Sequence, residues 1–79
     1  MSYPGETLKL AAMLLDGFEL EHAVMTLKLQ ASLYGGCCGV VSPNYDYAAA
    51  LDRLAAELEA CPDKPAAVAA LARLRQNAR

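Results

Sequence analysis

The fold is decided by residues 18–34, which read FELEHAVMTLKLQASLY. At about 100° per residue on a helix, the apolar side chains of this stretch fall on two opposite sides. The first stripe consists of Leu20, Ala23, Val24, Leu27, Ala31 and Tyr34. The second stripe consists of Phe18, His22, Met25, Leu29 and Leu33. Because a surface helix has one apolar stripe, this pattern predicts a central helix that is covered on both sides.

Glycine and proline divide the rest of the chain into three further predicted helices. The first is expected from Pro4 or Glu6 to Leu15, because proline is tolerated in a first helical turn and an acidic side chain is favourable there. Asp16-Gly17 then ends this helix, with Gly17 in the left-handed conformation that caps many helices. The glycines at positions 35 and 36 end the helix of residues 18–34.

The third predicted helix carries an apolar seam with spacings of four, three, four and three residues, as in packed helix pairs. The seam consists of Tyr47, Leu51, Leu54, Leu58 and Cys61. Ser42 or Asn44 is expected to cap the start of this helix, and Cys61 ends it. The fourth helix begins at Asp63-Lys64-Pro65 and runs to the C-terminus. These elements predict an all-α, compact four-helix single domain over residues 1–79, with a central second helix.

Composition and charge limit the classes of protein to which the chain can belong. Apolar residues make up 56% of the 79 positions and charged residues 20%, whereas a disordered chain has low hydrophobicity and high net charge. The net charge of −2 argues against non-specific binding to nucleic acid or an anionic membrane, since either needs a basic surface. No signal peptide is recognised, and no apolar run approaches the ~18 residues of a membrane span. Three cysteines, two of them adjacent, fit reduced thiols in a cytoplasm.

The size of the chain favours self-association. A domain this small buries only about 60% of the surface that its unfolded chain exposes. The first and second predicted helices are both apolar on more than one side, so surplus apolar surface is expected on the folded monomer. We therefore predict a homodimer, most simply with two-fold symmetry.

The residue types favour binding to another protein over catalysis. The chain has one histidine and no recognisable set of nucleophile, base and orienting group, and no cofactor is expected. We predict a small interaction module: an adaptor, a chaperone-like cap or a stoichiometric inhibitor of a larger assembly. Its expected partner-binding residues are Phe18, His22, Met25, Leu29, Leu33, Tyr34, Tyr45 and Tyr47. For Leu29 and Leu33, a place in the core of the monomer is an equally good interpretation.

A helix-turn-helix-like DNA-binding regulator is the alternative function. Residues 8–15, a glycine turn and the helix of residues 18–34 have the order of that motif. Residues 14–23 resemble the opening of small phage-type regulators, a match that identifies no family. The basic residues available for nucleic acid are Lys28, Arg73, Arg75 and Arg79. Nucleic acid is the less favoured partner because Glu19 and Glu21 occupy the end of the second helix that would approach DNA.

A further alternative is a ligand or metal site at the loop Gly35–Gly39. Backbone N–H groups of a glycine-rich loop can bind an anion, but this loop lacks the lysine and hydroxyl of a P-loop. The potential metal ligands are His22, Cys37, Cys38 and Cys61. Adjacent cysteines converge poorly on one ion, so a helix end followed by a tight connection is the favoured interpretation.

Overall fold

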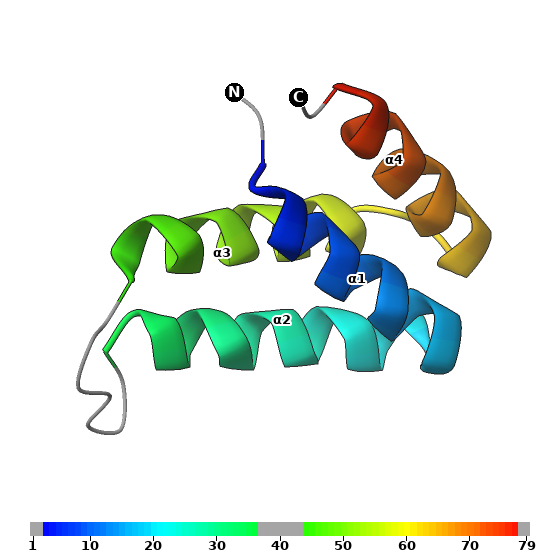
Figure 1. The fold of residues 1–79 in the computed structure, drawn as a ribbon. Helices are drawn as coiled ribbons and strands as arrows, with labels where there is room; N and C mark the ends of the chain where they lie inside the picture. Colours follow the sequence, from blue (N-terminus) through cyan, green and yellow to red (C-terminus); the bar gives the residue numbers. More distant parts are fainter. Residues whose placement is uncertain (1–2, 37–43, 78–79) are drawn as a thin grey trace.

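The computed structural model describes residues 3–36 and 44–77, and these residues form four α-helices (Figure 1). The helices are α1 (Gly5–Gly17), α2 (Leu20–Tyr34), α3 (Tyr45–Glu59) and α4 (Lys64–Asn77). The described residues contain no strand, and the all-α prediction is confirmed. Of the residues singled out above, Cys37, Cys38, Gly39, Ser42 and Arg79 lie outside the described part of the chain.

The end of α1 differs from the prediction. Gly17 is the last helical residue, and the helix stops because Phe18 adopts an extended conformation (φ −138°, ψ 166°) while its N–H still donates to the Leu14 carbonyl at 2.9 Å. The prediction of a left-handed cap at Gly17 is therefore wrong. Among the described glycines, the left-handed conformation occurs at Gly36, with a φ of 99°, directly after α2.

Side-chain caps fix the starts of α3 and α4. Asn44 Oδ1 accepts a hydrogen bond from the Tyr47 backbone N–H at 3.1 Å, and Asp63 Oδ1 accepts one from Ala66 at 2.9 Å. Each cap satisfies an N–H group that has no partner within its own helix. The prediction of a capping Asn44 is confirmed, and α3 ends at Glu59, two residues before the expected Cys61.

Replacing Asn44 with alanine is expected to lower the free energy of unfolding by about 1 kcal/mol, because the cap on α3 is lost. The measurement is urea unfolding followed by circular dichroism. Ser32→Ala, an exposed polar-to-alanine change within α2, is the control and should not lower the midpoint. Equal midpoints for wild type and Asn44→Ala would contradict a contribution from this cap.

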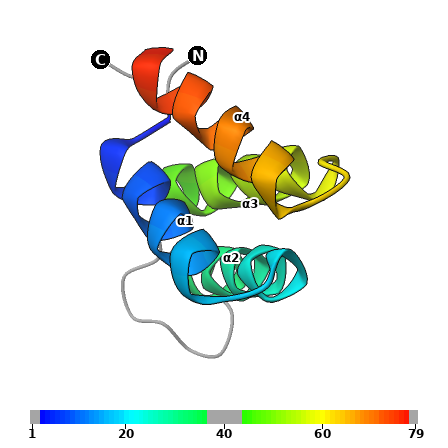
Figure 2. The ribbon, with the colours of Figure 1, turned by 90° about the vertical axis from the view of Figure 1, so that its right-hand side faces the viewer.

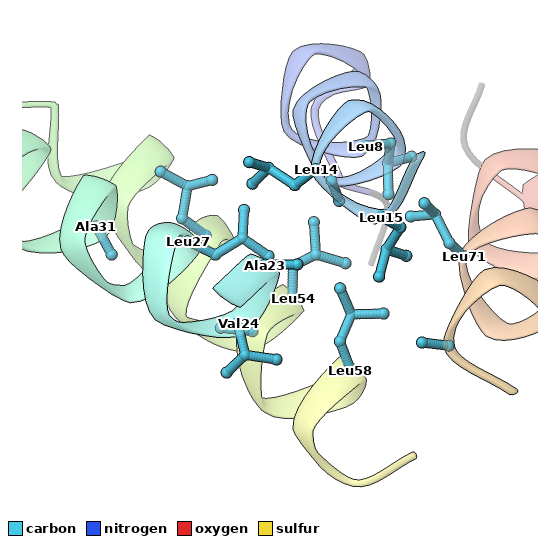
Figure 3. Close-up of a cluster of buried hydrophobic side chains, with 14 residues drawn as sticks. Leu8, Leu14, Leu15, Ala23, Val24, Leu27, Ala31, Leu54, Leu58 and Leu71 are labelled. Atoms are coloured by element: carbon cyan, nitrogen blue, oxygen red, sulfur yellow. The ribbon is translucent and has the colours of Figure 1, made fainter. Parts of the chain in front are cut away.

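The helices pack around α1 and α3. Helix α2 lies antiparallel beside α3, α1 crosses this pair, and α4 packs on α1 and α3 (Figures 1 and 2). The starts of α1 and the end of α4 lie on the side of the molecule away from α2, in both views. Side chains from all four helices converge in the core (Figure 3). The seam predicted for α3 is confirmed there, since Leu51, Leu54 and Leu58 are fully buried.

Helix α2 is not central within one chain. Helices α1 and α3 each pack against the three other helices, whereas α2 packs against α3 and α1 from one side. The first stripe makes these contacts, and the second stripe points away from the core. The physical reason is that α1, α3 and α4 pack against one another, and α1 and α3 pack on the first-stripe side of α2, so no described helix covers its other side. None of the described helices has the length and apolar character needed to cross a membrane.

Candidate docking surface on α2

The two stripes of α2 differ sharply in exposure. In the first stripe, the side chains that are 0–7% exposed are Ala23, Val24, Leu27 and Ala31. In the second stripe, exposure is 55% for Phe18, 57% for Met25, 60% for Leu29 and 39% for Leu33. Leu29 and Leu33, for which the sequence allowed either a core or a surface position, are therefore surface residues. A line of large apolar side chains therefore runs from Phe18, in the turn before α2, along the outer face of the helix.

An aromatic pair forms one end of this line. The rings of Phe18 and His22 meet edge to face, with centroids 6.3 Å apart and an interplanar angle of 65°. Phe18 belongs to the extended turn between α1 and α2, and His22 is exposed in the first turn of α2. Edge-to-face contact is one of the favourable arrangements of two aromatic rings, so Phe18 and His22 form one aromatic unit at this end of the second stripe.

Charged residues border the second stripe on the side that faces α3. Lys28 Nζ lies 2.8 Å from Glu59 Oε2, and both side chains are about half exposed (49% and 58%). An open groove runs beside this ion pair; its lining consists of Leu20, Glu21, Val24, Met25, Lys28, Glu59 and Cys61. The opposite border carries Glu19 and the uncharged Thr26 and Gln30. The edge with Glu21 and Lys28, the charged edge, thus carries charges of both signs, and the opposite edge carries one charge, at Glu19.

The three tyrosines predicted to bind a partner occupy different environments. Tyr34 and Tyr47 pack edge to face, with ring centroids 4.6 Å apart, and Tyr47 lies partly buried against the core. Burial, and after it the neighbouring Tyr34 and Glu6, raises the pKa of Tyr47 above its ordinary value. Tyr47 therefore belongs mainly to the packing of α3. Tyr45 is 67% exposed at the start of α3, outside the second stripe.

Of the four basic residues of the DNA-binding alternative, the three that the structure describes do not form one cluster. Lys28 is paired with Glu59 on α3, whereas Arg73 and Arg75 are exposed on α4. Arg75 lies beside Lys9 and other residues of the first half of α1. The outer face of α2, which would have to read the base edges, presents mainly carbon atoms where recognition needs hydrogen-bond donors.

The proposed metal ligands are also not gathered, as far as the described residues show. His22 is exposed on the second stripe, and the half-buried Cys61 donates its thiol hydrogen to the Glu57 carbonyl at 3.4 Å. In the described ranges, no group of three or more His, Cys, Asp or Glu side chains could hold a metal ion. Cys37 and Cys38 lie outside these ranges.

A second apolar opening lies between α1 and α4. Its lining consists of Ala12, Leu15, Asp16, Lys64, Val68, Leu71, Ala72 and Arg75. Val68, at 48% exposure, is its one large exposed apolar side chain, and charges of both signs stand at its edges. It offers less apolar surface than the second stripe, which has four such side chains.

Sequence reasoning missed the residue that pairs with Lys28 on the charged edge. Glu59 lies 31 positions from Lys28, and no local pattern pairs residues of two helices at that distance. Glu21 had a usable signal, because it precedes Lys28 by seven positions and two helical turns place both residues on one edge. The candidate docking surface therefore comprises the second stripe with this edge of Glu21 and Lys28. No protein-family model, no curated protein and no solved structure matches the chain.

Proposed function

We propose that the chain is a non-catalytic protein–protein interaction module and that the second stripe of α2 is its docking surface. One observation carries the proposal: α2 is buried along one face and exposes three large apolar side chains along the opposite face, with the exposed Phe18 in the turn just before it. Exposed apolar side chains that occur singly are ordinary on a protein surface, whereas a contiguous apolar patch marks an interaction site.

The proposed mechanism is coverage of a partner's surface in a fixed ratio. Phe18 and Leu29 supply apolar area, and Met25 supplies a flexible side chain that adapts to an irregular surface. Removing such area from water contributes about 25 cal/mol per Å², so association is driven by burial. Action as an adaptor, a cap or a stoichiometric inhibitor requires only this step.

The first partner that we propose is a second copy of the chain, in a two-fold homodimer. Two identical second stripes placed face to face would cover the apolar side chains that one chain leaves exposed. In that assembly α2 would have apolar neighbours on both sides, which is the environment that its sequence pattern predicts. The dimer thus reconciles the two apolar stripes with the edge position of α2 in the monomer.

Leu29→Glu is expected to weaken self-association at least tenfold, because a carboxylate would be buried in an apolar interface. Sedimentation velocity over a range of protein concentrations measures the effect. Val68→Glu places the same charge in the opening between α1 and α4 and is the matched control. A reducing buffer keeps the free thiol of Cys61 as it would be in the cytoplasm that we propose for this protein.

Wild type and Val68→Glu should therefore associate, while Leu29→Glu stays monomeric with unchanged helical content. Two results would contradict the proposal. One is a wild-type chain that is monomeric at every concentration. The other is a Leu29→Glu chain that unfolds, because position 29 would then belong to the core.

A further inference from the structure

The spacing of the second stripe suits a helix of similar pattern. Phe18, His22, Met25 and Leu29 follow one another at intervals of four, three and four residues. These intervals are the seam of a two-helix coiled coil, in which each side chain fits between side chains of the facing helix. Its helical part, residues 22–29 of α2, spans about 12 Å at 1.5 Å per residue, and Phe18 extends the line from the turn that precedes the helix.

The charged edge distinguishes the two directions in which a second α2 could lie. In a parallel pair, each edge residue faces the opposite edge of the partner helix, about five positions further along. Glu21 would then face Thr26, and Lys28 would face Leu33, so neither charge would meet an opposite charge. In an antiparallel pair, the charged edge of one helix faces the charged edge of the other. Glu21 then lies opposite the partner's Lys28, and two-fold symmetry repeats the contact.

We propose, resting on the proposed function, that the docking surface of α2 binds the α2 of a second copy in the antiparallel direction. Phe18 lies against the partner's Leu29, and His22 lies against the partner's Met25. Two-fold symmetry repeats each of these contacts, so each occurs twice in the dimer. The two-fold axis passes between His22 and Met25. Charge complementarity between Glu21 and the partner's Lys28 selects this direction.

The surroundings of Lys28 accommodate the additional contact. Its ammonium group already lies 2.8 Å from Glu59 while the side chain remains about half exposed. A lysine ammonium has three donors, so it can serve Glu59 and the partner's Glu21 together. Glu21 and Lys28 both line the open groove beside Met25, which leaves space for the charged ends of the partner's side chains.

The interface that results is small. One helix face from each copy buries less than the roughly 1,200 Å² that marks the lower end of stable interfaces. We therefore expect a dimer that dissociates on dilution. Its direction is best tested by charge changes, because they alter the edge and leave the apolar seam intact.

The experiment uses two full-length variants, Glu21→Lys and Lys28→Glu, alone and mixed. In the antiparallel pair, each variant alone places like charges opposite each other, so its homodimer should be about tenfold weaker than wild type. The mixture restores both opposite-charge contacts and should form a heterodimer in preference to either homodimer. Native mass spectrometry of equimolar mixtures separates the three species when one variant is uniformly labelled with nitrogen-15, because the charge changes alone alter the mass too little to resolve.

Glu19→Lys is the matched control, because it makes the same charge change on the opposite edge, where the other residues, Thr26 and Gln30, are uncharged, and should leave self-association as in wild type. Circular dichroism of each variant shows that it is folded. A heterodimer preference supports the antiparallel pair. If Leu29→Glu abolishes the dimer while the charge variants mix at random, the antiparallel direction is overturned and the proposed function stands. A monomeric wild type at every concentration overturns both.

Discussion

Leu54→Ala should lower the free energy of unfolding by about 3–5 kcal/mol. Leu54 is fully buried in the seam of α3 and belongs to the core cluster formed by all four helices. Shortening a buried leucine to alanine removes apolar contact and leaves a cavity that the surrounding side chains fill only in part. At about 0.05–0.15 kcal/mol per residue, a chain of 79 residues has a total stability of only about 4–12 kcal/mol. A large share of the stability therefore rests on this one side chain.

Urea unfolding monitored by far-ultraviolet circular dichroism measures this loss. The matched control is Leu29→Ala, which removes the same atoms from a side chain that is 60% exposed. At protein concentrations where the monomer prevails, we expect that change to stay within about 0.5 kcal/mol. Equal losses at the two positions would place the second stripe in the core and remove the basis of the docking surface.

Ala11→Leu is expected to destabilise the domain by about 1–3 kcal/mol, through overpacking. Ala11 is fully buried in α1, the helix that crosses α2 and α3. A methyl group at this position lets the helix backbones approach closely, and three additional carbon atoms would push α1 outward or force strained side-chain rotamers.

Thermal unfolding provides the measurement, since 1 kcal/mol shifts the Tm of a domain this size by about 4–8 °C. Ala49→Leu is the control, because Ala49 is exposed on α3 and the larger side chain enters solvent there. An unchanged Tm for Ala11→Leu would mean that the core beside α1 contains a void large enough for the leucine.

Local signals in the sequence predicted the helices well and their assembly less well. Asn44 and Asp63 mark helix starts because a cap is a contact between residues three positions apart. The predicted left-handed conformation of Gly17 is wrong because a glycine can end a helix in several ways. Here the following residue, Phe18, leaves the helical conformation instead. Boundaries that depend on the conformation of one residue cannot be derived from composition alone.

The docking surface shows a different limit. The sequence identifies both stripes of α2, yet it does not say how many apolar faces the rest of the chain has available to cover them. Leu27 and Leu29 have the same side chain two positions apart, and one is 0% exposed while the other is 60% exposed. That difference arises from the packing of α1 and α3 on one side of α2, which is a property of the whole fold.

The positions of the two ends of the domain determine where an attached group or domain would lie. The start of α1 and the end of α4 lie on the side away from α2 (Figures 1 and 2). A fluorophore, an affinity tag or a second folded domain joined at either end would thus project away from the docking surface. A group attached at either end would therefore be brought to the partner of α2 and would lie on the opposite side of the domain from that partner. The same arrangement allows two such domains to be joined in tandem, so that binding by the first raises the effective concentration of the second.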